Sequence, residues 1–386
     1  MKPFLRWGLR GLVVLLLLVA AGAAWKWPDV QRLLAVNALF DEDRIVANFS
    51  GMDELFFHAE IPLGAASASQ LPVDLRPIPD VSEWVEERWV TGIVVLKDGT
   101  VVHEDYFLGT LPEDRRISWS VAKSFLSALF GILLEEGAIS DIDAPVTRYV
   151  PELAGSGYDG VSIRQVLQMS SGVRFNEDYF DFNSDINRMG RVLALGGSMD
   201  AFAKGITERE RPPGERWQYV SIDTHVLGMV IRGATGRSAV ELMGERLLGP
   251  LGIESQAYYL TDGYGVAFVL GGLNMTTRDY ARFGQLFLQD GQWEDRGIVP
   301  AEWVRESTAP SANTTGLNIQ YGYQWWVPAD ARPGEFFARG IYGQYVYVDR
   351  QSGVVIAVNS ADRGFGAIHV FQENLEVFRR IAAALS

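Results

Sequence analysis

Residues 118–137 have the sequence SWSVAKSFLSALFGILLEEG, and this segment decides the centre of the fold. As a helix it would be apolar on nearly every side, and Gly137 is a residue suited to a helix terminus. A helix that is apolar all round belongs in the interior of a protein. The segment therefore predicts a buried helix from Ser118 to Glu136.

Strand patterns lie on both sides of this helix, helical patterns cluster between residues 140 and 290, and a final helix is predicted at Ala367–Leu385. This order predicts an α+β fold. In this predicted fold, an antiparallel sheet built from both chain ends is flanked by helices and interrupted in sequence by a largely helical inserted region. The predicted strands are Trp89–Leu96, Val101–Phe107, Gln344–Asp349 and Val354–Asn359.

The N-terminus has the pattern of an export or membrane segment. Three basic residues precede the charge-free, apolar stretch Gly11–Trp25. We expect residues 1–27 to be a signal peptide or a membrane anchor; a buried helix is the remaining alternative. A retained anchor would place the domain in the periplasm or otherwise outside the cytoplasm, at the inner membrane, and a cleaved signal would export it. Residues 28–85 are expected to form an N-terminal arm and residues 86–386 the main domain.

Composition excludes several classes of protein. The net charge is −14 and no basic cluster stands out after the N-terminus, so we expect no nucleic-acid partner. Cysteine is absent, which excludes disulfides, thiolate zinc sites and cysteine nucleophiles. The four histidines lack metal-binding spacing, so we expect no metal and no cofactor, and a structural role for His103 and His225. The oligomeric state is not predicted.

Ser120 and Lys123 form the candidate catalytic pair. Residues three apart on a helix share a face, so the two side chains can meet. A buried lysine loses its proton readily and can then accept the proton of a serine hydroxyl, which arginine cannot do. Ser120 is the single serine with a lysine three residues later. Because the motif has only two letters, chance occurrence is the alternative.

Two later segments could complete such a site. Tyr219 precedes a predicted helix and could relay a proton to a leaving group, or it could simply be a core aromatic. The segment from Ala338 to Gly343 could approach a substrate closely, with the amide of Ile341 joining that of Ser120 in an oxyanion hole, or it could be an ordinary glycine-rich turn.

These three elements, in this order, resemble the serine β-lactamase and penicillin-binding-protein superfamily over roughly residues 86–385. The chain is similar to the class C-like branch, which holds family VIII carboxylesterases, D-amino-acid peptidases and 6-aminohexanoate-dimer hydrolases. The segments Phe175–Tyr179 and Gly340–Gln344 resemble the last group most.

The resemblance implies a role for each site residue. Ser120 would be the acylated nucleophile, Lys123 the base and Tyr219 the proton relay. The amides of Ser120 and Ile341 would form the oxyanion hole. The residues implied to contact the substrate are Tyr179, Ser221, Gly340 and Tyr342.

Two departures from the family motifs bear on the substrate. Ser221 replaces the asparagine of the second motif, and Ala338-Arg339-Gly340 lacks the lysine or histidine of the third. We therefore expect a serine hydrolase that cleaves small amides or esters through an acyl-enzyme. The alternatives are a β-lactamase or D-Ala-D-Ala carboxypeptidase, and a catalytically silent binding protein on the same fold.

Overall fold

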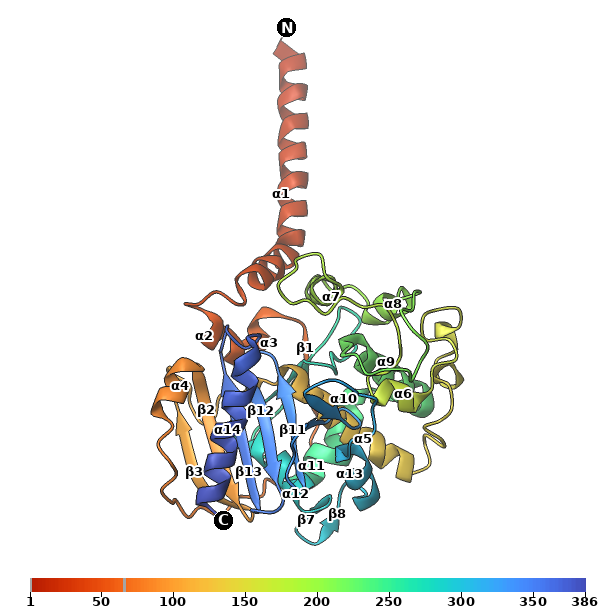
Figure 1. Cartoon of the computed structure of the whole chain (residues 1–386). Coiled ribbons are helices and arrows are strands. Elements are labelled where there is room, and N and C mark those ends of the chain that lie inside the picture. The colour runs from red at the N-terminus through yellow and green to blue at the C-terminus, as the bar shows by residue number, and fades with distance from the viewer. Residues whose placement is uncertain (1, 65–66) are drawn as a thin grey trace.

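The computed structural model describes residues 2–64 and 67–386, and its centre is an antiparallel sheet (Figure 1). The sheet has seven strands in the order β3-β2-β13-β12-β11-β10-β9. Two come from the first third of the chain and five from its end; β2, β3, β12 and β13 correspond to the predicted strands, whereas β9, β10 and β11 were not predicted. Their bounds are β2 (Val90–Lys97), β3 (Thr100–Tyr106), β9 (Ile319–Tyr321), β10 (Trp326–Pro328), β11 (Glu335–Gly340), β12 (Gln344–Asp349) and β13 (Val354–Ser360).

Helices cover both faces of this sheet. On the inner face, α5 (Ala122–Glu135) and α12 (Thr277–Leu288) belong to the larger core. On the outer face, α4 (Ser82–Glu87) and α14 (Ile368–Ala384) close a smaller one. Alternate side chains of β2 enter the two cores, which is why the strand is apolar along nearly its whole length. The expected α+β fold is confirmed.

The predicted central helix starts later than expected. A 3₁₀ turn η1 (Trp119–Val121) precedes α5, and its first residue, Trp119, has a positive φ of 42°, outside the α-helical region. Within the block of predicted helical patterns, residues 239–248 form α10 (Ala239–Leu242) followed by a wider-wound turn at Met243–Leu248.

The helical block lies beside the main sheet, and the remaining short strands form two small sheets (Figure 1). Its helices are α6 (Ile163–Leu167), α7 (Asp185–Ala194), α8 (Met199–Lys204), α9 (Ser221–Thr235), α11 (Gly249–Leu251) and α13 (Ala301–Thr308). A second sheet has the order β1-β5-β6-β4, and β7 pairs with β8. These strands are β1 (His58–Glu60), β4 (Arg116–Ile117), β5 (Tyr258–Leu260), β6 (Leu273–Met275), β7 (Gln292–Trp293) and β8 (Arg296–Gly297).

The N-terminal helix α1 (Lys2–Ala38) continues past residue 27 and projects from the domain (Figure 1). Its stretch Gly11–Ala38 is long and apolar enough to cross a membrane by length and composition, and is not buried in the protein. The following helices α2 (Ile45–Ser50) and α3 (Met52–Leu55) place Phe49 in the main core. Part of the expected arm is thus integrated with the domain.

Candidate active site

Ser120 lies in the 3₁₀ turn between strand β4 and helix α5. The positive φ of Trp119 turns the backbone immediately before it, a strained conformation that often occurs at functional positions. Ser120 lines a cavity of about 380 Å³. The turn therefore presents a serine hydroxyl to an internal space.

Lys123 lies one turn further along and is 1% exposed. Its Nζ atom is 2.8 Å from Ser120 Oγ and donates to the carbonyl oxygen of Leu270, also at 2.8 Å. Burial lowers the pKa of the Lys123 ammonium to about 7, and the nearby Glu177 carboxylate opposes this effect. The amine is therefore neutral in a substantial share of molecules at neutral pH and can accept a proton.

Tyr219 lies beside the same pair. The segment before α9 is held by backbone hydrogen bonds, including that from the Gln218 amide to the Met169 carbonyl at 2.9 Å. The Tyr219 ring centroid is 5.2 Å from Lys123 Nζ. Burial raises the pKa of the Tyr219 phenol, and the Ser120 hydroxyl partly counters this by hydrogen bonding. The phenol is therefore protonated and next to the serine.

Sequence reasoning missed Glu177, which organises two of the predicted residues. The Ser221 hydroxyl donates to this carboxylate, the Ser221 amide donates to it at 2.9 Å, and the Tyr179 hydroxyl donates at 2.7 Å. Burial raises the pKa of Glu177, while Lys123 and these donors lower it. Glu177 lies two residues before Tyr179 in a loop, where no periodicity marks it.

The end of β11 approaches the serine turn closely. A Cβ atom on Gly340 would lie 2.7 Å from the Ser118 carbonyl oxygen and 3.0 Å from the Ser120 amide nitrogen, so a side chain does not fit there. Ile341 and Tyr342 follow and line the cavity. The predicted substrate-contacting residues Tyr179 and Ser221 line the same cavity.

Arg339 does not face the cavity. Its guanidinium lies over the rings of Phe371, at 5.2 Å, and Trp326, at 5.9 Å. Phe371 belongs to α14 on the outer face of the sheet. The cation therefore lies on the outer face of the sheet and not at the cavity wall, although its charge partly opposes the rise in the pKa of the Tyr219 phenol.

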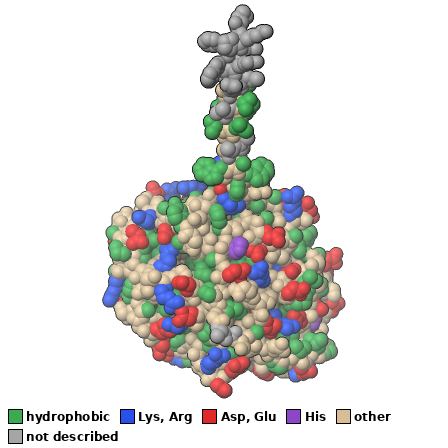
Figure 2. Space-filling view, turned by 180° about the vertical axis from the view of Figure 1, so that it is seen from behind, with side chains coloured by type: hydrophobic (Ala, Val, Ile, Leu, Met, Phe, Trp, Pro, Cys, Tyr) green, Lys and Arg blue, Asp and Glu red, His purple; other side chains and the backbone are tan. Residues whose placement is uncertain are grey.

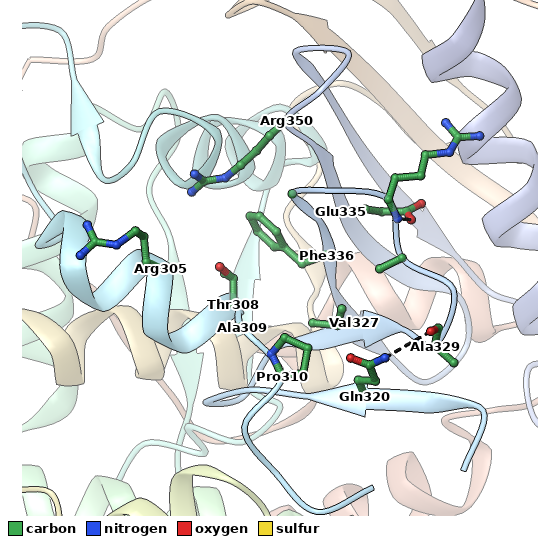
Figure 3. Close-up of a pocket in the computed structure, with 13 residues that line it drawn as sticks. Arg305, Thr308, Ala309, Pro310, Gln320, Val327, Ala329, Glu335, Phe336 and Arg350 are labelled. Carbon is green, nitrogen blue, oxygen red and sulfur yellow. Dashed lines mark hydrogen bonds between the residues drawn. The ribbon is translucent and has the colours of Figure 1, made fainter. Parts of the chain in front are cut away.

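Other polar sites in the described part of the chain lack this arrangement. An open pocket of about 410 Å³ lies between Arg305, Glu335 and Arg350, away from Ser120 (Figure 3). Its Thr308 hydroxyl donates to the Val304 carbonyl at 2.7 Å and has no basic partner. His225 Nε2 is 2.8 Å from Asp200, and His225 does not line the cavity at Ser120. No group of metal-ligating side chains gathers among the described residues.

Comparisons with known proteins agree with this fold. The beta-lactamase family profile matches residues 81–373. The 6-aminohexanoate-dimer hydrolase of Paenarthrobacter ureafaciens is 33% identical over 298 residues, which cover 73% of this chain and 76% of that protein.

Two solved structures share the fold. A Bacillus anthracis protein, provisionally named a 6-aminohexanoate-dimer hydrolase, has a TM-score of 0.81 and 24% identity, covering 90% of this chain and 96% of that one. A D-stereospecific amidohydrolase from Streptomyces sp. has a TM-score of 0.60 and 21% identity, covering 76% of this chain and 98% of that one. The resemblance stated from the motifs is confirmed.

Proposed function

The chain belongs to the beta-lactamase family and is a hydrolase, and from this premise we propose that it cleaves small amides or esters through an acyl-enzyme on Ser120. One observation carries the proposal. The Nζ atom of Lys123, whose pKa burial lowers to about 7, is 2.8 Å from the Ser120 hydroxyl oxygen. The similarity to a 6-aminohexanoate-dimer hydrolase supports an amide or ester as the substrate class.

The proposed acylation step uses these groups in turn. Neutral Lys123 accepts the Ser120 proton while Oγ forms a bond to the substrate carbonyl carbon. The amides of Ser120 and Ile341 donate to the oxyanion. The Tyr219 phenol then protonates the leaving amine or alkoxide as the carbon–leaving-group bond breaks, and recovers a proton from Lys123.

Deacylation reverses these roles. Water replaces the leaving group, its proton passes through Tyr219 and Lys123, and the carboxylic acid is released with Ser120 restored. Glu177 does not touch the reacting atoms. It holds the Ser221 and Tyr179 hydroxyls at the cavity wall and acts as a positioning residue.

Active-site labelling tests the proposal. A fluorophosphonate should modify Ser120 in the wild-type protein and leave Ser120→Ala unlabelled and inactive on p-nitrophenyl esters. The matched control is Ser124→Ala, because the Ser124 hydroxyl donates to the Gln324 carbonyl at 2.7 Å and is turned away from Lys123. A label on another serine, with Ser120→Ala still active, would refute the mechanism. A complete absence of labelling and turnover would favour a silent binding protein.

The orientation of Arg339 disfavours the β-lactamase or carboxypeptidase alternative. A β-lactam carries a carboxylate that a cation must hold, and this cation faces the opposite side of the sheet. Lasting acylation by a fluorescent penicillin, with slow ester turnover, would reverse that preference.

We also propose that α1 anchors the protein in the inner membrane, with the domain outside the cytoplasm. Trp25 and Trp27, 78% and 55% exposed, suit a membrane interface. In this proposal residues 1–27 are the membrane segment, and residues 28–85 connect it to the hydrolase domain at 86–386. Release of the protein from membranes by carbonate, without detergent, would contradict the anchor.

A further inference from the structure

The wall of the cavity at Ser120 is mostly apolar, with polar side chains at Asn37, Ser120, Tyr179, Asn187 and Ser221. Among its described lining residues Arg191 is the single charged one. The guanidinium of Arg191 lies 4.0 Å from the Phe182 ring centroid and donates to the Phe182 carbonyl at 2.8 Å, so it is already engaged at the outer loop. Residues that close the wall nearer the core include Met52, Met189, Leu193, Leu260, Phe268 and Leu270.

This lining selects an uncharged acyl group. A terminal ammonium, such as that of a 6-aminohexanoyl chain, would lose its hydration there without meeting a carboxylate among the described wall residues. An unbranched hydrocarbon chain gains affinity from the same surface, by about fourfold for each methylene group buried.

The cavity wall also contains the end of the membrane helix. Val36, Leu39 and Phe40, from the C-terminal end of α1 and just after it, line the cavity, and the Phe40 ring stacks on Tyr342 with centroids 4.7 Å apart. Val36 lies nine positions after Trp27, which in a helix is about 14 Å. The headgroup layer on each side of a bilayer is roughly 5–8 Å thick. The cavity thus begins close to the membrane surface.

The outer rim of the cavity is exposed and aromatic. Phe180 and Phe182 are 76% and 65% exposed, although both lie against the cavity. Helix α7, which forms the neighbouring wall, lies beside the base of α1 (Figure 1). Figure 2 shows hydrophobic side chains gathered along the lower part of α1 and where it joins the domain. The exposed aromatic rim of the cavity and the base of α1 therefore lie next to each other.

From these observations we propose that the substrate is a membrane-resident amphiphile whose uncharged acyl chain enters the cavity from the bilayer surface. This inference rests on the proposed serine hydrolase function. The chain lies against the wall formed by α7 and the end of α1, and its ester or amide carbonyl meets Ser120. The bond to the alcohol or amine breaks, that product returns to the headgroup layer, and water releases the fatty acid from the acyl-enzyme.

A matched pair of soluble esters tests the acyl preference. Hexanoyl and 6-aminohexanoyl esters of one alcohol differ only in the terminal ammonium, and the wild-type kcat/KM should favour hexanoyl by at least about tenfold. Gly190 lines the cavity, and a Cβ atom there would meet nothing within 4 Å. The carboxylate of Gly190→Asp could pair with the terminal ammonium, so this variant should have a smaller preference for the hexanoyl over the 6-aminohexanoyl ester. The neutral control Gly190→Asn should keep the wild-type preference. Equal rates, or a preference for 6-aminohexanoyl, in the wild-type protein would overturn the inference.

A vesicle experiment tests the membrane route. The full chain is reconstituted in phosphatidylcholine vesicles, and a diacyl phospholipid with a dye-labelled ester chain is placed either in the same vesicles or in separate ones. Hydrolysis should occur only in the same vesicles. Equal rates in both arrangements, or none in either while an acetyl ester is turned over, would refute the inference alone. A protein that neither turns over the acetyl ester nor labels at Ser120 would refute the proposed function first, and the inference with it.

Discussion

The titration of Lys123 should control the activity of this hydrolase. Burial lowers the pKa of its ammonium from 10.5 to about 7. At pH 7, an amine with a pKa of about 7 is neutral in about half of the molecules, whereas one at 10.5 is neutral in about 0.03%, a difference of about 10³-fold. Since the neutral amine is the base, kcat/KM should rise with pH through about 7 and then level off.

The perturbation is Lys123→Arg, which keeps the positive charge and approximate size but cannot release a proton at working pH. The kcat/KM for a p-nitrophenyl ester should fall by about 10²–10⁴-fold, and the rise near pH 7 should disappear. Lys97→Arg is the matched control, because Lys97 lies at the end of β2 beside Asp98 and outside the site. The reasoning fails if Lys123→Arg keeps most of the wild-type rate, or if the wild-type profile is flat across pH 7.

Further variants test the neighbouring groups. Glu177→Gln removes a charge that favours the Lys123 ammonium, so the pKa of Lys123 should fall and the acid limb of kcat/KM should move to lower pH; a shift to higher pH would contradict this role. Gly340→Ala should lower kcat strongly in ester assays, because its Cβ would lie 3.0 Å from the Ser120 amide nitrogen; near-wild-type kcat would show that this approach is unimportant. Lys123→Met should be inactive but more stable to heat at pH 7 than the wild type. The native pKa of Lys123 lies below the unfolded value, so the melting temperature of the wild type should rise relative to that of Lys123→Met between about pH 7 and 10.5. The same change of melting temperature with pH in both proteins would refute this. Short p-nitrophenyl esters should exceed nitrocefin in kcat/KM by at least about tenfold, since Arg339 is turned away; a faster reaction with nitrocefin would reinstate the β-lactamase alternative.

The fold class could be predicted because it follows from the local spacing of apolar residues along the chain. The apolar surface of α5 required a position in the core, and the strands at both chain ends required a common sheet. The chemistry of Ser120 and Lys123 was also accessible, because residues three apart in a helical turn are neighbours whatever surrounds them. The distance of 2.8 Å between Lys123 Nζ and Ser120 Oγ agrees with this prediction from sequence spacing.

Contacts between distant segments could not be predicted in this way. Glu177 and Ser221 are separated by 44 residues, and only the packed loop brings the carboxylate to the hydroxyl. Arg339 is next to Gly340 in sequence but faces α14, because successive side chains of a strand point to opposite faces. The sequence by itself determined which groups can do chemistry and which segments are apolar. Only tertiary structure decided that the end of α1 lines the cavity at Ser120, since that contact depends on how the whole chain packs.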